Sequence, residues 1–223
     1  MGMSAEQDED VPSIEQLLSG ACDALPLFPL PGMVFLPFTL LPLHVFEPRY
    51  RALVRDVLAA DGVLAVPQLL GAEKSGGGPA PLAPVVGVGR IVQHQTMPDG
   101  RSNIVLAGIG RARILREIPG DTPYRVVQAR PLPAPSADSG LARPRLQAAL
   151  AALAQREPAV SRPVQTLLER DVETPGLCAA VAHMLIRDPD QRQAFLELER
   201  ESEQVEHLLV AISSISAVPG VEA

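Results

Sequence analysis

The spacing of hydrophobic residues changes along the chain, and each change predicts a different kind of structure. Between residues 25 and 43, apolar side chains alternate with five prolines. Because proline has no N–H to donate, this segment predicts short or bent strands. Residues 48–60 instead carry apolar side chains at helical spacing, with Pro48 suited to the first helical position and Gly62 suited to the C-terminal cap. We therefore expect one helix inside a strand-rich region.

From residue 63 onward the apolar positions indicate short strands. We expect strands over residues 63–70, 85–95, 102–109, 111–118 and 124–130, with a hairpin turn at residues 97–100. Two pairs of glycines, Gly87/Gly89 and Gly108/Gly110, interrupt these strands. They indicate bulges or a close approach of strands, because the third glycine and the strand–turn–helix context of a nucleotide-binding loop are missing. Together these segments predict a small, strongly bent β-domain with one inserted helix.

Helical patterns dominate after a segment rich in proline. We expect helices over residues 142–156, 164–171 and 174–186, and a last helix that begins after Asp188 and extends to Ile215. The sequence thus predicts an α+β protein that ends in a helical hairpin or bundle. Its expected parts are a flexible acidic tail at residues 1–23, a β-domain at 24–131, a linker at 132–140, a helical domain at 141–216 and a tail at 217–223.

Charge and composition narrow the classes of partner. The 223 residues carry 19 basic and 26 acidic side chains, a formal net charge of −7, and only 3% of them are aromatic. Phosphate backbones and anionic membranes are poor partners for such a chain, and few aromatic rings are present to stack on bases. The N-terminal segment is acidic rather than basic, and no apolar run reaches the ~18 residues of a membrane span. We expect a cytoplasmic protein that binds neither nucleic acid nor membrane.

Lysine is so rare that it excludes several enzyme classes. The only lysine, Lys74, lies in the glycine-rich stretch 71–78, which is typical of a flexible and solvated loop. A P-loop requires a lysine after its last glycine, and a Ser–Lys dyad or a Schiff base requires a desolvated lysine. ATP hydrolysis, Ser–Lys proteolysis and Schiff-base chemistry are therefore not expected.

No other set of residues predicts catalysis, a metal or a cofactor. Cys22 and Cys178 are too far apart in sequence to indicate a disulfide framework or a zinc site, and Cys178 is expected to be a small buried residue. The four histidines lack ligand spacing. His44 lies near Glu47, Arg49 and Tyr50 without a partner serine or cysteine, and Glu47 suits a helix N-terminus. We expect a protein without enzymatic activity.

Several motifs follow one another in an order that resembles a known family. They are Leu25-Pro-Leu-Phe-Pro-Leu-Pro-Gly-Met-Val-Phe-Leu-Pro37, Pro42-Leu-His-Val-Phe-Glu-Pro-Arg-Tyr-Arg51, Val86-Gly-Val-Gly-Arg-Ile91, Asp99-Gly-Arg101, Leu106-Ala-Gly-Ile-Gly-Arg-Ala-Arg-Ile114, Ala182-His-Met-Leu185 and Pro189-Asp-Gln-Arg-Gln-Ala-Phe-Leu-Glu197. Across residues 24 to 214 the chain resembles the amino-terminal, substrate-binding domain of the ATP-dependent protease Lon. The long coiled-coil extension of Lon and the zinc-binding cysteines of the related cereblon domain have no counterpart here.

The resemblance implies a PUA-like bent β-barrel followed by helices. It also implies a stand-alone recognition module for unfolded polypeptides or a specific protein partner, with a protease acting in trans as one such partner. The alternative within the same fold is a PUA-like sensor that binds a small molecule or RNA. The oligomeric state is left open by these observations.

Two groups of residues are candidates for binding. Met33, Phe35, Leu36 and Phe38 lie in a proline-rich run, where an apolar surface for exposed segments of unfolded proteins would form; the alternative interpretation places them inside the barrel. The second group is a set of arginines on the predicted sheet that would carry RNA, or form a solvated face with ion pairs to Glu117 and Asp121. These arginines are Arg90, Arg101, Arg111, Arg113 and Arg116.

Overall fold

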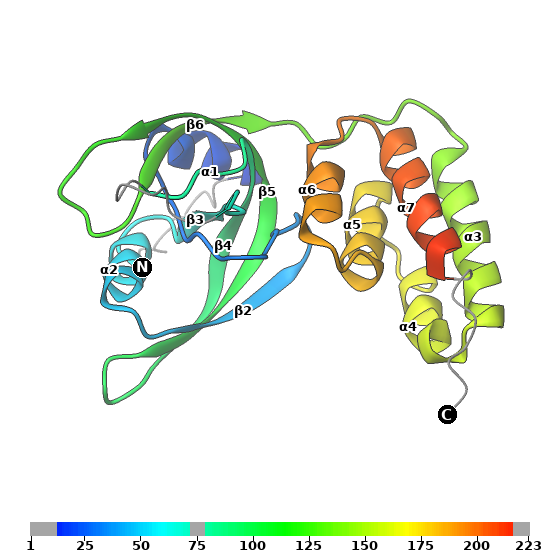
Figure 1. The fold of residues 1–223 in the computed structure, drawn as a ribbon, viewed down its shortest axis with the longest axis horizontal. Helices are drawn as coiled ribbons and strands as arrows, with labels where there is room; N and C mark the ends of the chain where they lie inside the picture. Colours follow the sequence, from blue (N-terminus) through cyan, green and yellow to red (C-terminus); the bar gives the residue numbers. More distant parts are fainter. Residues whose placement is uncertain (1–12, 72–78, 216–223) are drawn as a thin grey trace, which may run out of the picture.

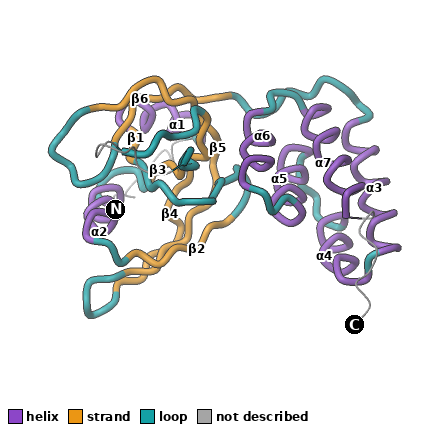
Figure 2. Tube along the Cα trace, viewed as in Figure 1, coloured by secondary structure: helices purple, strands orange, loops and turns teal. Residues whose placement is uncertain are grey.

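The computed structural model describes residues 13–71 and 79–215. Residues 1–12 of the expected N-terminal tail (1–23), the expected tail at 217–223 and the loop around Lys74 lie outside the described residues. The described chain has a β-part, residues 13–132, followed by a helical part, residues 142–215, with a connecting segment between them (Figure 1). This arrangement confirms the predicted α+β class, and Figure 2 shows how completely the strands and the later helices are separated.

The β-part is an antiparallel sheet of six strands in the order β1-β6-β5-β4-β3, with β2 paired to β5. The strands are β1 (Leu25–Pro26), β2 (Leu40–Val45), β3 (Val63–Val66), β4 (Val85–Thr96), β5 (Ser102–Ile118) and β6 (Val126–Leu132). The chain after β1 returns to the opposite edge of the sheet, where Leu27 bridges Ala65 of β3 and the Phe28 N–H donates to the Ala65 carbonyl at 2.8 Å. The bent sheet therefore closes on itself. Helix α2 (Pro48–Leu58) begins at the proline expected to start it.

Strand β5 differs from its prediction. Two strands were expected over residues 102–109 and 111–118, but one strand of 17 residues spans both. The register of β4 against β5 shifts next to Gly89, and a Cβ placed on Gly108 would lie 2.4 Å from the Leu36 carbonyl oxygen. These glycines therefore mark an irregular register and a close backbone approach, as predicted. They allow β5 to bend through the barrel without ending.

The segment before the barrel is a helix rather than a flexible tail from residue 13 onward. Helix α1 (Ile14–Ala21) begins with a reciprocal capping box between Ser13 and Gln16. The short 3-10 helix η1 (Cys22–Ala24) continues it to β1. Leu17 and Leu18 of α1 are buried, so the expectation of a mobile tail up to residue 23 is wrong for residues 13–23. Capping and burial together stabilise a helix of only eight residues.

The helical part contains five helices among the described residues. They are α3 (Ala142–Arg156), α4 (Pro158–Leu168), α5 (Thr174–Leu185), α6 (Pro189–Glu197) and α7 (Glu201–Ile215). Helix α3 has the predicted bounds, and the Asp188 side chain caps α6 by accepting from the Gln191 N–H at 2.8 Å. The expected single helix from Asp188 to Ile215 is wrong, because α6 ends at Glu197 and a separate helix, α7, begins at Glu201. There the backbone of Ser136 pairs with the carbonyl of Glu199 at 2.9 Å and with the N–H of Glu201 at 3.0 Å.

One apolar cluster is shared by the two parts. Val34, Leu36 and Val85 of the β-part pack with the buried side chains of α3–α7. Gln193 of α6 reinforces this junction, because its side-chain amide donates to the Val85 carbonyl at 2.9 Å. No helix in the described ranges has both the length and the apolar character needed to cross a membrane.

Candidate functional site

The four apolar residues proposed from the sequence do not form one surface. Phe35 is 2% exposed within the barrel core, and Leu36 is 1% exposed within the cluster shared with the helices. Met33 is partly buried against the barrel core, whereas Phe38 is 57% exposed. Along residues 33–38, Phe35 packs in the barrel core, Leu36 packs in the cluster shared with the helices, and Phe38 points outward. Phe35 and Leu36 therefore fill the interior, and Phe38 is the member of the set whose side chain faces solvent.

The backbone at Phe38 is held in an unusual conformation. Its φ of 62° lies in the left-handed region, which a bulky side chain rarely adopts. The Phe38 N–H donates to the Gly108 carbonyl at 2.8 Å, and the Gly108 N–H donates to the Thr39 carbonyl at 2.8 Å. The Thr39 hydroxyl donates to the Leu36 carbonyl at 2.7 Å. These bonds stabilise a strained turn that exposes an aromatic ring, a combination found more often at binding sites than elsewhere.

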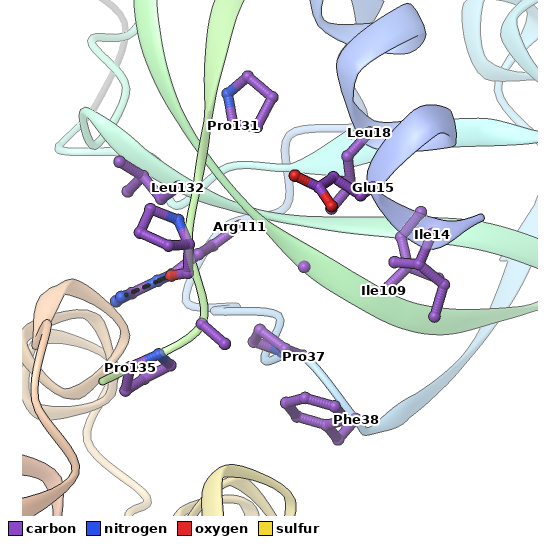
Figure 3. Close-up of a pocket in the computed structure, with 13 residues that line it drawn as sticks. Ile14, Glu15, Leu18, Pro37, Phe38, Ile109, Arg111, Pro131, Leu132 and Pro135 are labelled. Carbon is purple, nitrogen blue, oxygen red and sulfur yellow. Dashed lines mark hydrogen bonds between the residues drawn. The ribbon is translucent and has the colours of Figure 1, made fainter. Parts of the chain in front are cut away.

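Phe38 lies on the wall of an apolar pocket of about 620 Å³. The pocket is bounded by α1, by the middle of β5 and by the chain that leaves β6, as Figure 3 shows. Ile14 of α1, 56% exposed, supplies a second large apolar group. Neither Ile14 nor the prolines after β6 were predicted to line a binding site, although the apolar positions of the first helical turn were a usable signal. The lining residues are Ile14, Glu15, Leu18, Pro37, Phe38, Ile109, Gly110, Arg111, Pro131, Leu132, Pro133, Ala134 and Pro135.

Arg111 supports one wall of this pocket from inside the protein. It is 3% exposed, and its guanidinium donates to the Pro133 carbonyl at 3.1 Å, to the Leu196 carbonyl at 2.7 Å and to the Leu198 carbonyl. Burial lowers the pKa of Arg111 from its usual value. The guanidinium thus joins β5 to the chain after β6 and to the C-terminal end of α6.

The prediction that Arg111 lies on an exposed arginine face of the sheet is therefore wrong, because its side chain is buried. Arg101 forms an ion pair with Asp99 at 2.6 Å within the hairpin turn, and Arg116 donates to the Gln128 side chain at 3.0 Å. Glu117, one of the two expected partners of this group, forms an ion pair with Arg125 instead. An RNA-binding surface built from these arginines would lack Arg111 and would compete with an existing ion pair at Arg101.

The remaining chemical candidates have structural partners. His44 Nδ1 and Asn103 Oδ1 are 2.8 Å apart, Glu47 pairs with Arg49 at 2.9 Å, and the Tyr50 hydroxyl donates to the Pro29 carbonyl at 3.2 Å. Cys22 and Cys178 are both buried, and burial raises the pKa of Cys178 to about 12. Its thiol is therefore a poor nucleophile. Among the residues that the structure describes, no three histidine, cysteine or acidic side chains are grouped to hold a metal ion.

Comparison with protein families identifies the relatives of this chain. Residues 24–214 match the model of the ATP-dependent protease La (LON) substrate-binding domain. The chain belongs to the Lon substrate-binding domain family. Among solved structures, the crystal structure of a Lon N-terminal domain protein from Xanthomonas campestris has a TM-score of 0.61 and 26% sequence identity, and the match covers 84% of this chain and 97% of that one. The shared fold therefore extends over both the β-part and the helical part.

Two curated relatives of this chain are much longer proteins, and a second solved structure shares its fold. Lon protease 2 of Myxococcus xanthus is 32% identical over 116 residues, which are 52% of this chain and 13% of that protein. The Lon protease of Anaeromyxobacter dehalogenans is 31% identical over 116 residues, 12% of its length. This chain thus matches about one eighth of the length of these proteases. The N-terminal domain of a Mycobacterium avium complex Lon protease shares the fold, with a TM-score of 0.65 at 18% identity over 85% of this chain and 98% of that one.

Proposed function

We propose that this Lon substrate-binding domain homologue is a non-catalytic recognition module that binds polypeptides in the pocket beside Phe38. The observation that carries the proposal is an aromatic ring, 57% exposed, held at a φ of 62° on the wall of an apolar pocket of about 620 Å³. Membership of a family described as substrate-binding supports it.

The pocket has the physical properties that a polypeptide site needs. Its volume is within the range of known ligand sites, roughly 300–1,000 Å³, and it can accept one or two large apolar side chains. Prolines at positions 37, 131, 133 and 135 line it, so little backbone entropy is lost when a ligand binds. Apolar contact with few polar groups favours many sequences rather than one, which suits exposed segments of unfolded proteins.

The partners follow from this chemistry. An unfolded polypeptide or a specific protein with an exposed apolar segment would place that segment against Phe38 and Ile14. Delivery to a protease in trans is the consequence that we propose for such binding. Because the net charge of the protein is −7, nucleic acid is a poor alternative ligand for it.

The test is a binding titration with a matched pair of variants. Labelled unfolded casein is titrated with the protein and followed by fluorescence anisotropy, with native globular protein as the competitor. Phe38→Ser removes the ring on the pocket wall, and Phe46→Ser removes a ring of similar exposure, 59%, that does not line the pocket. We expect Phe38→Ser to weaken binding at least tenfold, the typical effect of a central aromatic contact, and Phe46→Ser to leave it unchanged. Equal effects of the two changes, or no saturable binding, would refute the proposal.

A further inference from the structure

A second, smaller pocket lies where the connecting segment meets the first turns of three helices. Its volume is about 330 Å³. In contrast to the pocket beside Phe38, its walls are rich in polar and charged groups, including two carboxylates and two hydroxyls. The lining residues are Ala137, Asp138, Ser139, Gly140, Arg143 of α3, Thr174 of α5 and Glu201 of α7.

Glu201 is the unusual member of this set. It is 9% exposed, and no residue in the ranges 13–71 and 79–215 forms a hydrogen bond or ion pair with its carboxylate, whose oxygens keep some contact with water. Two other acids do have partners: Asp138, which also lines the pocket, accepts from the Ser202 N–H at 3.1 Å, and Glu203, two residues after Glu201, pairs with Arg200 at 2.5 Å. A carboxylate that has lost part of its hydration without gaining a protein partner costs free energy.

The charges around Glu201 leave the pocket negative. Burial is the main cause that raises the pKa of Glu201, and the carboxylates of Asp138 and Glu173 raise it further. Arg143 opposes this effect, but its guanidinium donates to the Val172 carbonyl at 2.6 Å and forms no ion pair with Glu201 within 4.0 Å. Two carboxylates therefore line the pocket with one arginine that is already engaged, and Glu173 adds a further negative charge nearby. A ligand with a positive charge would supply the missing partner.

We propose that this pocket binds a primary ammonium or guanidinium group, as carried by a lysine or arginine side chain of the polypeptide ligand. Glu201 would accept its hydrogen bonds, and the carboxylate of Asp138 and the hydroxyl groups of Ser139 and Thr174 would surround it. A divalent metal fits less well, since the described residues contain no group of three or more acidic, histidine or cysteine side chains placed to hold one. The origin of the cation in a polypeptide rests on the proposed function; the affinity of the pocket for the cation does not.

The first experiment uses small probes on the whole protein. n-Butylammonium and n-butylguanidinium are titrated against protein with labelled glutamate carboxyl groups, with neutral 1-pentanol as the isostere, and binding is followed by NMR. We expect saturable shifts of the Glu201 signal by the cations, with a Kd on the order of 1 mM, and none by the alcohol. The cation should also lower the pKa of Glu201. An equal response to 1-pentanol would overturn the proposal.

Two variants of one helix provide the control. Glu201→Gln removes the charge inside the pocket, and Glu206→Gln removes an exposed charge on α7 that pairs with Arg145. We expect Glu201→Gln to weaken binding of the cations at least tenfold and Glu206→Gln to leave it unchanged. Because both variants lose one negative charge, equal losses would mean that only the net charge matters and would contradict a site at Glu201.

A second experiment separates the two proposals. Unfolded casein and lysine-acetylated casein are compared on the wild-type protein and on Glu201→Gln. We expect acetylation to weaken binding to the wild-type protein and to have little effect on the variant. If casein binds but neither acetylation nor Glu201→Gln matters, the cation site is refuted while polypeptide recognition stands. If casein does not bind and butylammonium still binds at Glu201, the site stands with a free amine as its ligand, and the proposed function fails.

Discussion

At the scale of single residues, Gly108 determines how the Phe38 turn sits on the barrel. A Cβ at this position would lie 2.4 Å from the Leu36 carbonyl oxygen and 3.0 Å from Pro37 Cα, so the turn could not approach β5 as it does. Backbone atoms cannot move aside as the tip of a side chain can. We expect Gly108→Ala to lower the free energy of unfolding by about 3 kcal/mol, the upper part of the range for overpacked sites. Urea unfolding measures the loss.

Gly120 provides the matched control for this change. A Cβ there would meet no atom within 4 Å, so Gly120→Ala should alter the free energy of unfolding by less than about 0.5 kcal/mol. Removing a glycine reduces the entropy of the unfolded chain and so stabilises the fold slightly, which means that similar losses in the two variants would contradict the contact with Leu36 as the cause.

Glu201 makes the second prediction at this scale, through the pH dependence of stability. Its pKa is raised in the folded protein by burial, Asp138 and Glu173 and is opposed by Arg143, so the folded state binds its proton more tightly than the unfolded state does. The charged carboxylate therefore destabilises the fold above this pKa, and the penalty disappears as pH falls toward the usual glutamate pKa of about 4.3. We expect Glu201→Gln to have the higher thermal midpoint at pH 7.5, with the difference shrinking toward pH 4. A difference that is constant with pH would contradict this account.

A candidate site can be predicted from sequence only as far as its side chains contact residues that are close to them along the chain. The proline-rich run correctly indicated short strands, as β1 and β2 are, but whether Phe35 or Phe38 faces outward depends on a turn held by bonds to Gly108. Arg111 resembles its neighbours Arg113 and Arg116 in the sequence, but its guanidinium is internal because it binds the carbonyls of Leu196 in α6 and of Pro133 after β6. Such distinctions come from contacts between distant segments, which the spacing of residue types does not encode.

At the scale of elements, α2, α3 and α5 begin where the sequence predicted. In contrast, α4 begins at Pro158 rather than at the expected residue 164, and the break between α6 and α7 was not predicted. Helix α3 has its expected bounds, and α2 begins at Pro48 as expected. The division between α6 and α7 was missed because its cause is Ser136, more than sixty residues earlier, whose backbone pairs with Glu199 and Glu201. Between α6 and α7, backbone hydrogen bonds to Ser136 of the connecting segment therefore take the place of hydrogen bonds within a helix.

Arg111 provides a prediction for the end of α6. Replacing it with methionine leaves the carbonyls of Pro133, Leu196 and Leu198 without their donor in a buried place. We expect Arg111→Met to lower the free energy of unfolding by about 3 kcal/mol, since each unsatisfied buried acceptor costs about 1–3 kcal/mol and some will find water. Hydrogen exchange should locate the change at the end of α6. Arg116→Met, which removes only an exposed bond to Gln128, should cost less than about 0.5 kcal/mol. If the two variants lose equal stability, Arg111 does not anchor α6.

At the scale of the whole molecule, the two parts share a core rather than merely a linker. Val34, Leu36 and Val85 belong to the same apolar cluster as the helices α3–α7, and Gln193 adds a bond from α6 to β4. Opening the junction would expose these side chains to water, which is unfavourable in proportion to the apolar area uncovered. The pocket beside Phe38 and the pocket beside Glu201 therefore belong to one folding unit. The distance between them is fixed for any ligand that contacts both.

This shared core predicts that both parts unfold together. The two tyrosines of the chain, Tyr50 and Tyr124, lie in the β-part, and tryptophan is absent, so intrinsic fluorescence reports the barrel alone. Far-ultraviolet circular dichroism reports mainly α3–α7, which hold most of the helix. We expect the two signals to give coincident urea transitions, because neither part buries its share of the common cluster without the other. Arg111→Met should shift both midpoints together. A helical transition that is complete while tyrosine fluorescence is still native would show that the barrel is stable by itself and that the junction contributes little.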